Sequence, residues 1–238
     1  MSGLFELHID DPRAVPMAID IFRSARPLIF LQMPSVYTLI APPTRDGVAM
    51  LDQAKLRLPS KSYGSAIGSV QEFHSLAEPN AWPDSLSTPE QLSHLEGAFI
   101  RLHVARPVFS SSVVRDGTHQ GLLLPQGQHR ELFSILEVQT LNNQETALFD
   151  GKRYAAPLCT SANLSGDPLG SITDETRALN FAKDRELKLW IRCDSTKSAP
   201  GSYPIFYFVN NSVSVERNGP EKDRILSSIP ESIERVTR

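Results

Sequence analysis

Two hydrophobic periods alternate along the chain, one typical of strands and one typical of helices. Short apolar runs bounded by turn residues predict strands, and they span residues 4–8, 27–31, 37–41, 107–114, 121–124, 155–159, 187–193, 205–209 and 213–216. Apolar residues three to four apart predict helices, and these span residues 15–25, 48–54, 129–136 and 173–183. Thr44, which follows two prolines, and Thr173 are the expected N-caps of two helices. This alternation predicts an α/β or α+β domain around a twisted mixed sheet with flanking helices.

Three segments depart from the alternation. Residues 78–90 are rich in Pro and Ser and predict a surface loop, with a helix start at residues 88–90. Residues 141–153 are mostly polar and predict an inserted loop. A chain of 238 residues with 40% hydrophobic content can bury one sizeable core. We therefore expect a single domain over residues 1–220, followed by a C-terminal tail or short amphipathic helix over residues 221–238.

Composition narrows the range of functions. A formal net charge of −3 and a pI near 6.1 argue against a general RNA binder, so any RNA contact would be a local patch. The longest apolar runs are far shorter than the ~20 residues of a membrane helix, and the N-terminal segment does not resemble a secretory signal. We expect a cytoplasmic protein without a membrane segment. The two cysteines, Cys159 and Cys193, and the six histidines lack metal-ligand spacing, so no protein-held metal is expected.

Two short segments carry the candidate chemistry. Lys55, Arg57 and Lys61 bring three cations within seven residues, and a triphosphate site without a Gly-rich loop needs such side chains. About a hundred residues later, the turn 161–166 (Ser-Ala-Asn-Leu-Ser-Gly) follows a predicted strand, where hydroxyl and amide groups can reach a ligand. Each motif also has a structural explanation, since cations suit helix C-termini and Ser, Asn and Gly suit turns. Together they predict a nucleoside triphosphate site.

The same two motifs resemble those of the YrdC/YciO-type domain of threonylcarbamoyl-AMP synthases. That family has a lysine and an arginine separated by one residue, then a Ser-Ala-Asn turn ending in Ser-Gly. Further segments resemble the family in the same order. Residues 32–39 (QMPSVYTL) are similar to its Pro-Thr-acid-Thr-Val-Tyr-Gly-Leu, residues 106–109 to its Gly-Pro-Val-Thr, and residues 217–219 to its Arg-X-Gly. The resemblance covers most of the chain and implies a YrdC-like fold with a central concave cleft.

The resemblance implies a nucleotidyltransferase that joins L-threonine, bicarbonate and ATP, with Mg²⁺, into threonylcarbamoyl-AMP for tRNA modification. It implies catalytic roles for Lys55 and Arg57. The residues implied to bind ATP are Lys55, Arg57, Lys61, Ser161, Asn163, Ser171 and Arg217. Those implied on the threonine side are Ser35 and Ser202. No nucleophilic side chain is implied, because catalysis would come from positioning and charge compensation.

One position departs from the family pattern. The family commonly has an arginine in a Gly-Val-Arg-X-Pro strand that pairs with the substrate carboxylate, and Leu123 stands in its place within residues 121–125. Losing that partner forfeits a charge-assisted bond of roughly 1.5–3 kcal/mol. Two alternatives therefore stay open. One is a non-catalytic or re-purposed paralogue that binds nucleotide, tRNA or double-stranded RNA, and the other is an interaction domain with a relict cleft.

Overall fold

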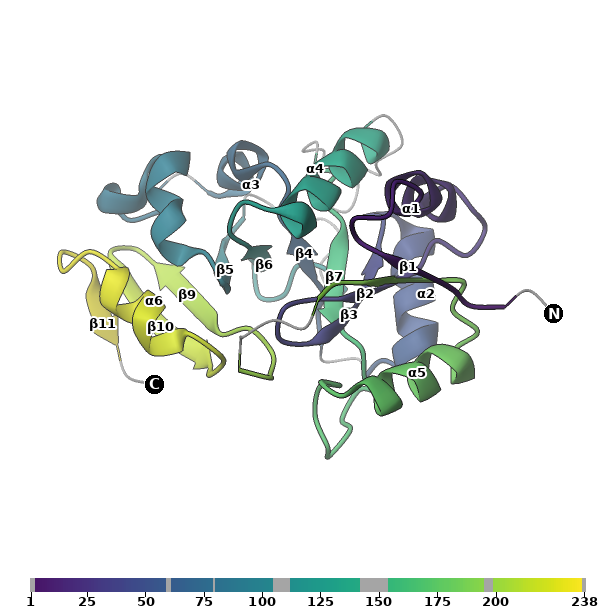
Figure 1. Ribbon diagram of the computed structural model, residues 1–238. Coiled ribbons are helices and arrows are strands. Elements are labelled where there is room, and N and C mark those ends of the chain that lie inside the picture. The colour runs from purple at the N-terminus through teal and green to yellow at the C-terminus, as the bar shows by residue number, and fades with distance from the viewer. Residues whose placement is uncertain are drawn as a thin grey trace.

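The computed structural model describes residues 3–58, 61–78, 80–104, 112–141, 154–194 and 199–236. Within these ranges, eleven strands form one mixed sheet that runs the length of the molecule (Figure 1). In spatial order the strands are β1 (Phe5–His8), β8 (Leu189–Arg192), β2 (Ile29–Gln32), β3 (Tyr37–Ala41), β7 (Leu158–Ser161), β4 (Gly64–Ala66), β6 (Thr118–Leu123), β5 (Ala98–His103), β9 (Ile205–Val209), β10 (Ser212–Arg217) and β11 (Glu234–Val236). The helices are α1 (Ala14–Phe22), α2 (Arg45–Lys55), α3 (Val70–Leu76), α4 (Gln128–Thr140), α5 (Glu175–Asp184) and α6 (Lys222–Ser228), with 3-10 segments η1 (Asp84–Leu86) and η2 (Pro89–Leu95).

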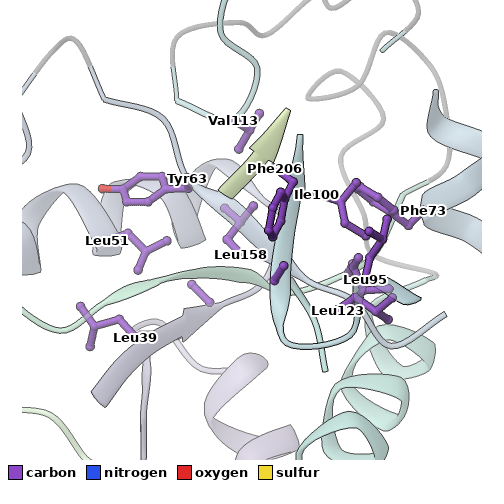
Figure 2. Packing of buried hydrophobic residues seen from close by; sticks show 14 of the residues in the cluster. Leu39, Leu51, Tyr63, Phe73, Leu95, Ile100, Val113, Leu123, Leu158 and Phe206 are labelled. Atoms are coloured by element: carbon purple, nitrogen blue, oxygen red, sulfur yellow. The ribbon is translucent and has the colours of Figure 1, made fainter. Parts of the chain in front are cut away.

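Side chains alternate along the strands and build a separate core on each face of the sheet. In β2, Ile29 and Leu31 belong to one core, whereas Phe30 belongs to the other. Helices α1 and α4 pack on the Ile29 face, and α2, α3, α5 and α6 pack on the Phe30 face. Figure 2 shows the core of the Phe30 face, which runs from Leu39 and Leu51 to Phe73 and Leu123. The predicted mixed sheet with flanking helices is confirmed.

Helix ends follow local hydrogen-bonding chemistry. The predicted N-cap of α2 is confirmed, because the Thr44 hydroxyl accepts a hydrogen bond from the Gly47 amide at 3.1 Å. The predicted cap of α5 is wrong by one residue. Asp174, rather than Thr173, takes the N-cap position, and its carboxylate accepts from the Arg177 amide at 2.8 Å.

The other departures from the sequence predictions lie mainly in the middle of the chain. Strands β4 and β5 and helix α3 were not predicted. Residues 112–114 of the predicted strand 107–114 form no strand, and residues 105–111 lie outside the described ranges. Most of the predicted inserted loop, residues 142–153, lies outside them too. Within the predicted surface loop 78–90, Trp82 and Leu86 are buried in the core.

The C-terminal segment contributes more than a tail. It forms the predicted short helix, α6, in which Ile225 is fully buried. It then adds strand β11, which pairs in parallel with β10 at one edge of the sheet. The division between a domain over residues 1–220 and a tail stays a prediction.

Candidate functional site

A cavity of about 270 Å³ opens on one face of the central strands. Its apolar lining consists of residues from the Ile29-face core, namely Val36, Phe99, Leu122, Cys159, Tyr203 and Ile205. The cavity therefore lies on the same sheet face as α1 and α4 and is lined by residues of strands β3, β7, β4, β6, β5, β9 and β10. We call this cavity the cleft.

The charged side chains of the cleft are all cationic in the part of the chain that the structure describes. They are Lys55, Arg57, Lys61, Arg101, Arg115 and Arg217, and no aspartate or glutamate lines the cavity there. A wall with this charge distribution suits a ligand that carries several negative charges.

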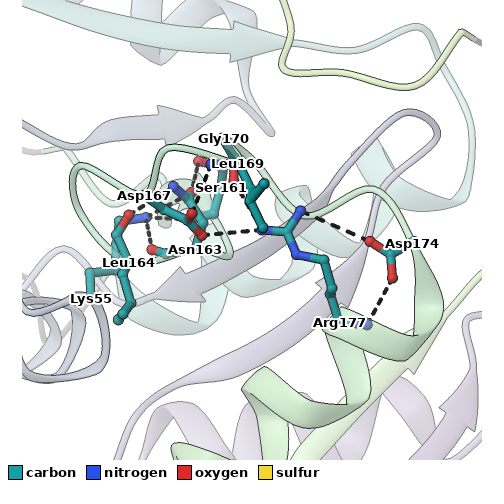
Figure 3. Close-up of polar contacts among 9 residues, drawn as sticks. All are labelled: Lys55, Ser161, Asn163, Leu164, Asp167, Leu169, Gly170, Asp174 and Arg177. Carbon is teal, nitrogen blue, oxygen red and sulfur yellow. Dashed lines mark hydrogen bonds and ion pairs between the residues drawn. The ribbon is translucent and has the colours of Figure 1, made fainter.

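Lys55 joins the two motifs that the sequence analysis singled out. Its side chain is 2% exposed, and its Nζ donates to the carbonyl oxygens of Ser161 at 2.5 Å and Asn163 at 2.8 Å (Figure 3). In return, the Ser165 amide donates to the Lys55 carbonyl at 2.9 Å. Burial, together with the charges of Arg57 and Lys61, lowers the pKa of Lys55 to about 7. Lys55 therefore clamps the end of α2 to the turn 161–166.

The turn itself is held from both ends. The Ser161 hydroxyl donates to Asn163 Oδ1 at 2.7 Å, and the Ala162 amide donates to the Tyr37 carbonyl of β3 at 2.8 Å. Gly166 has a φ of +83°, a left-handed conformation that glycine adopts without strain. Beyond it, Asp167 forms an ion pair with Arg177 of α5 at 3.1 Å, which Figure 3 also shows. The two predicted motifs are thus brought together as one rigid wall of the cleft.

Arg57 follows a left-handed residue, Leu56, at the end of α2. Its guanidinium lies 4.0 Å from the centroid of the Tyr63 ring and donates to the carbonyl oxygens of Lys61, at 3.2 Å, and of Ser62. Burial lowers the pKa of Arg57 below its usual value. Lys61, by contrast, is exposed at the edge of the cleft, where its ammonium can meet an incoming anion.

A β-bulge places Arg217 in the cleft. The pairing of β10 with β9 shifts register between Val215 and Arg217, so Arg217 lies opposite Ile205, whose side chain lines the cavity. Its Nε and one terminal nitrogen donate to the Tyr203 carbonyl at 2.9 and 2.7 Å. Burial lowers the pKa of Arg217 to about 10.

The three serines outside the turn occupy different positions. Ser202 lines the cleft, and its hydroxyl lies 2.5 Å from that of Ser171. Ser171 therefore stands behind Ser202 and does not line the cavity itself. Ser35 is buried and does not line the cavity, although its carbonyl accepts from the Gly201 amide beside Ser202 at 2.8 Å. Of the serines implied on the threonine side, only Ser202 reaches the cavity.

The comparison of Leu123 with the family arginine needs a correction. Leu123 is 1% exposed in the Phe30-face core, opposite the cleft, whereas its neighbour Leu122 lines the cleft. An arginine side chain at position 123 would therefore point away from the cavity. Sequence reasoning also missed Arg115, which precedes β6, and Arg101, because strand β5, which carries Arg101, was not predicted. The alternation of Ala98, Ile100 and Leu102 with larger or polar residues was the available signal.

Other reactive groups near the cleft are held neutral. Burial raises the pKa of the Cys159 thiol to about 12, so this cleft residue is not a ready nucleophile. Burial lowers the pKa of His119 to about 4, and its ring nitrogens lie within hydrogen-bonding distance of Ser65 Oγ and the Val113 carbonyl. Across the described ranges, no group of three His, Cys, Asp or Glu side chains could hold a metal ion.

The described part of the chain contains no helix long and apolar enough to cross a membrane.

Comparison with known proteins gives a clear result for the fold. No sequence model of a protein family and no curated protein sequence matches the chain. Among solved structures, Sua5 from P. abyssi in complex with L-threonine superposes with a TM-score of 0.69 at 15% identity, over 98% of this chain and 62% of the Sua5 chain. E. coli YciO gives a TM-score of 0.64 at 14% identity, over 92% of this chain and 96% of YciO. HypF in a phosphate- and nucleotide-bound form gives 0.59 at 15% identity, over 86% of this chain and 28% of HypF.

The chain thus spans less than two thirds of that Sua5 chain and almost the whole of YciO. At these identities the similarity establishes the fold. The chain has the fold of Sua5 and YciO, as the resemblance in its sequence motifs implied.

Proposed function

We propose that this chain is a divergent member of the family of Sua5 and YciO, and that it uses the cleft to join L-threonine, bicarbonate and ATP into threonylcarbamoyl-AMP for tRNA modification. The observation that carries the proposal is the cleft lining, in which two motifs of that family meet and six cations stand without a carboxylate among the described residues. The Sua5 structure with L-threonine and the nucleotide-bound HypF structure support it by showing small molecules bound to proteins of this fold.

The proposed reaction needs no nucleophilic side chain. The threonine amine and bicarbonate give a carbamate with loss of water, and a carbamate oxygen attacks the α-phosphorus of ATP. The bond from that phosphorus to the bridging oxygen breaks, and pyrophosphate leaves with the electron pair. The cleft would contribute orientation and compensation of negative charge, which are effective in a partly desolvated site.

We infer different roles for the residues implied to bind ATP. Arg57, Lys61 and Arg217 line the cavity with cationic groups for phosphate oxygens. The ammonium of Lys55 already donates to two carbonyl oxygens, so we assign Lys55 to shaping the turn on which Ser161 and Asn163 stand. Ser171 would act only through Ser202.

The test begins with an equilibrium titration of ATP, followed by pyrophosphate release with bicarbonate in the presence and absence of L-threonine. ATP binding with threonine-stimulated release supports the synthase. Lys61→Ala is expected to weaken ATP binding about tenfold through loss of an exposed phosphate contact, and Lys183→Ala on α5 serves as the matched control outside the cleft lining. A protein that binds no ATP would overturn the proposal.

A second candidate is a nucleotide-binding paralogue without threonine chemistry. It is favoured by the absence of a cleft-facing arginine on β6, where Gln120 and Leu122 line the cavity. ATP binding without stimulation by threonine would select this candidate. Binding of double-stranded RNA with affinity that falls steeply with added salt would instead indicate that the cations contact phosphodiesters.

A further inference from the structure

A second cavity, of about 280 Å³, lies behind the end of α2, and we call it the rear pocket. Its apolar lining consists of Leu28, Met50, Ala54 and Leu56. Leu28 and Ala54 belong to the core of the Phe30 face, whereas the apolar lining of the cleft belongs to the core of the Ile29 face. The rear pocket and the cleft therefore lie on opposite faces of the sheet.

Consecutive residues at the end of α2 alternate between the two cavities. Ala54 and Leu56 line the rear pocket, whereas Lys55 and Arg57 line the cleft. Leu56 stands at the centre of this alternation in a left-handed conformation, with a φ of +47° and a ψ of +59°. Residues other than glycine adopt this conformation at a cost. A ligand in the rear pocket would therefore bind the same conformation that places Lys55 and Arg57 in the cleft.

One cation of the rear pocket, Arg185, takes part in no ion pair with the residues that the structure describes. Arg26 and Glu186, which also line the pocket, pair with each other at 3.1 Å and so compensate each other's charge. Arg185 follows α5, and its Nε donates to the Ala54 carbonyl at 2.8 Å. Its Nη1 donates weakly to a second backbone oxygen, that of Asp184, at 3.4 Å. The guanidinium is thus anchored on α2 while its charge lacks a carboxylate partner in this part of the chain.

Apolar surface beside such a guanidinium suits a small apolar carboxylic acid. The Leu56 side chain is 65% exposed, so a bound hydrocarbon group would remove leucine surface from water. Anchoring through Nε leaves the terminal nitrogens of Arg185 for a charge-assisted bond to a carboxylate. A cavity of roughly 150 Å³ is enough to hold benzene, so the larger rear pocket has room for an acid of about six carbons.

We propose that the rear pocket binds a small apolar carboxylic acid, with the carboxylate on Arg185 and the hydrocarbon on Leu56 and Met50, and that its occupation raises the affinity of the cleft for an anionic ligand. The coupling passes through the end of α2, because both ligands bind the same conformation of Leu56. It is mutual, so a ligand in the cleft raises the affinity for the acid by the same factor. The site lies beyond the proposed function, and only the choice of ATP as the cleft ligand rests on that function.

A purely structural Arg185 would only cap the carbonyl groups at the end of α2. In that case the rear pocket is a gap between helix ends, and it has no preference among small molecules of equal size. Recognition of a carboxylate requires instead that an acid bind better than its amide, and that this preference vanish without Arg185.

The experiment titrates hexanoate, hexanamide and hexylamine, without nucleotide, and follows leucine and methionine methyl groups and backbone amides by NMR. The wild-type protein is expected to bind hexanoate about tenfold or more tightly than the other two. The Leu56 and Met50 methyl signals should shift, as should the Ser165 amide, which donates to the Lys55 carbonyl. Arg185→Gln is expected to abolish the preference. Arg23→Gln, at an exposed position outside both cavities, is the matched control and should keep it.

Leu56→Asn guards against loss of the fold, because asparagine tolerates the left-handed conformation and Leu56 is exposed. It is expected to weaken hexanoate binding about fivefold, through loss of the apolar contact, while Arg185 is retained. A titration of ATP with and without saturating hexanoate then measures the coupling. The acid is expected to raise the affinity for ATP about three- to tenfold in the wild type and to leave it unchanged in Arg185→Gln.

Three results would overturn the site: equal binding of hexanoate and hexanamide, tighter binding of hexylamine, or a preference for the acid that survives Arg185→Gln. Hexanoate binding that changes neither the Ser165 amide signal nor the affinity for ATP would overturn the coupling. A protein that binds hexanoate through Arg185 but binds no ATP defeats the proposed function alone, and the Ser165 signal then decides the coupling. ATP binding without any preference for the acid defeats this inference alone.

Discussion

At the scale of single residues, Lys55 is a buried cation that holds one wall of the cleft in place. Its ammonium donates to the carbonyl oxygens of Ser161 and Asn163 in the turn 161–166, of which the Ser161 carbonyl also accepts from the Asn163 amide at 3.1 Å. A buried carbonyl without a donor costs about 1–3 kcal/mol. The lysine side chain therefore stabilises the shape of the turn, and its positive charge also contributes to the electrostatic potential of the cleft.

Lys55→Met is expected to destabilise the fold by about 1–3 kcal/mol, because methionine keeps the length of the side chain but removes the ammonium that donates to the Asn163 and Ser161 carbonyl oxygens. Urea denaturation of the variant measures the loss. Lys61→Met is the matched control, since Lys61 is exposed, and its stability should stay within about 0.5 kcal/mol of the wild type. Equal stability of the two variants would show that the hydrogen bonds from Lys55 to the turn 161–166 do not stabilise the fold.

Glu137 makes stability depend on pH. It is buried on α4, and its Oε2 accepts from the amides of Gly68 and Ser69 at 3.2 and 2.8 Å. Burial raises its pKa from 4.5 to about 7 despite these bonds. Between these two values the folded state holds a proton that the unfolded state has released. The stabilisation from Glu137 is therefore full below pH 4.5 and is lost as the pH rises through about 7.

Glu137→Gln is expected to be more stable than the wild type by about 2 kcal/mol at pH 8 and nearly equal to it at pH 4.5, because the amide oxygen can still accept from Gly68 and Ser69. Denaturation curves at both pH values provide the comparison. Glu131→Gln, at an exposed position of the same helix, should retain the wild-type pH dependence. If the two proteins differed in unfolding free energy by the same amount at both pH values, Glu137 would not be the source of the pH dependence.

At the scale of elements, the end of α2 decides how the first motif reaches the cleft. Leu56 adopts a φ of +47° and ψ of +59°, and the helix stops there. The Arg57 amide then donates back to the Asp52 carbonyl at 3.1 Å. This left-handed turn lets Lys55 point into the protein while Arg57 packs on Tyr63. The residue between the two cations thus determines their different environments.

Leu56→Gly is expected to stabilise the protein by about 0.5–1 kcal/mol, because glycine relieves left-handed strain and the leucine side chain is 65% exposed. Thermal unfolding would detect the gain as a higher Tm. Leu58→Gly is the control, because Leu58 is also exposed but is not among the residues with positive φ. Leu58→Gly should lower the Tm. A lower Tm for Leu56→Gly as well would refute the inference that Leu56 is strained.

The N-cap of α5 offers a test that separates adjacent residues. Asp174→Ala is expected to cost about 1 kcal/mol, because it removes the acceptor for the Arg177 amide. Thr173→Ala, one position earlier, should change the free energy of unfolding by less than about 0.5 kcal/mol. If chemical denaturation showed a larger loss of unfolding free energy for Thr173→Ala than for Asp174→Ala, Thr173 would be the N-cap.

At the scale of the whole molecule, one sheet separates two cores, and the cleft opens on one of its faces. Residues from seven strands line the cleft on that face. A one-residue slip in any of these strands would send its side chains to the other core. In the same way, the bulge in β10 places Arg217 opposite Ile205 at the cleft.

The strands that the sequence predicted correctly are those whose apolar residues form a clear pattern. Strands with clear apolar runs were placed well, and residues 37–41 and 205–209 match β3 and β9 in full. Strand β4 has the sequence Gly-Ser-Ala, which carries no apolar pattern. The face of Leu123 could not be read from three consecutive leucines, because a uniform run has no period. Proximity of the two motifs was predicted, whereas the inward direction of the Lys55 ammonium required the fold.

The bond from Lys55 to Ser161 joins positions 106 residues apart. Such a contact is slow to form, because a long stretch of chain must be ordered before the two segments meet. A ligand held between the end of α2 and the turn would therefore act as a reversible cross-link on the folding equilibrium, adding RT ln(1 + [L]/Kd) to the free energy of unfolding. Saturation of the cleft should then protect amides in both halves of the chain from hydrogen exchange, including those far from the bound molecule.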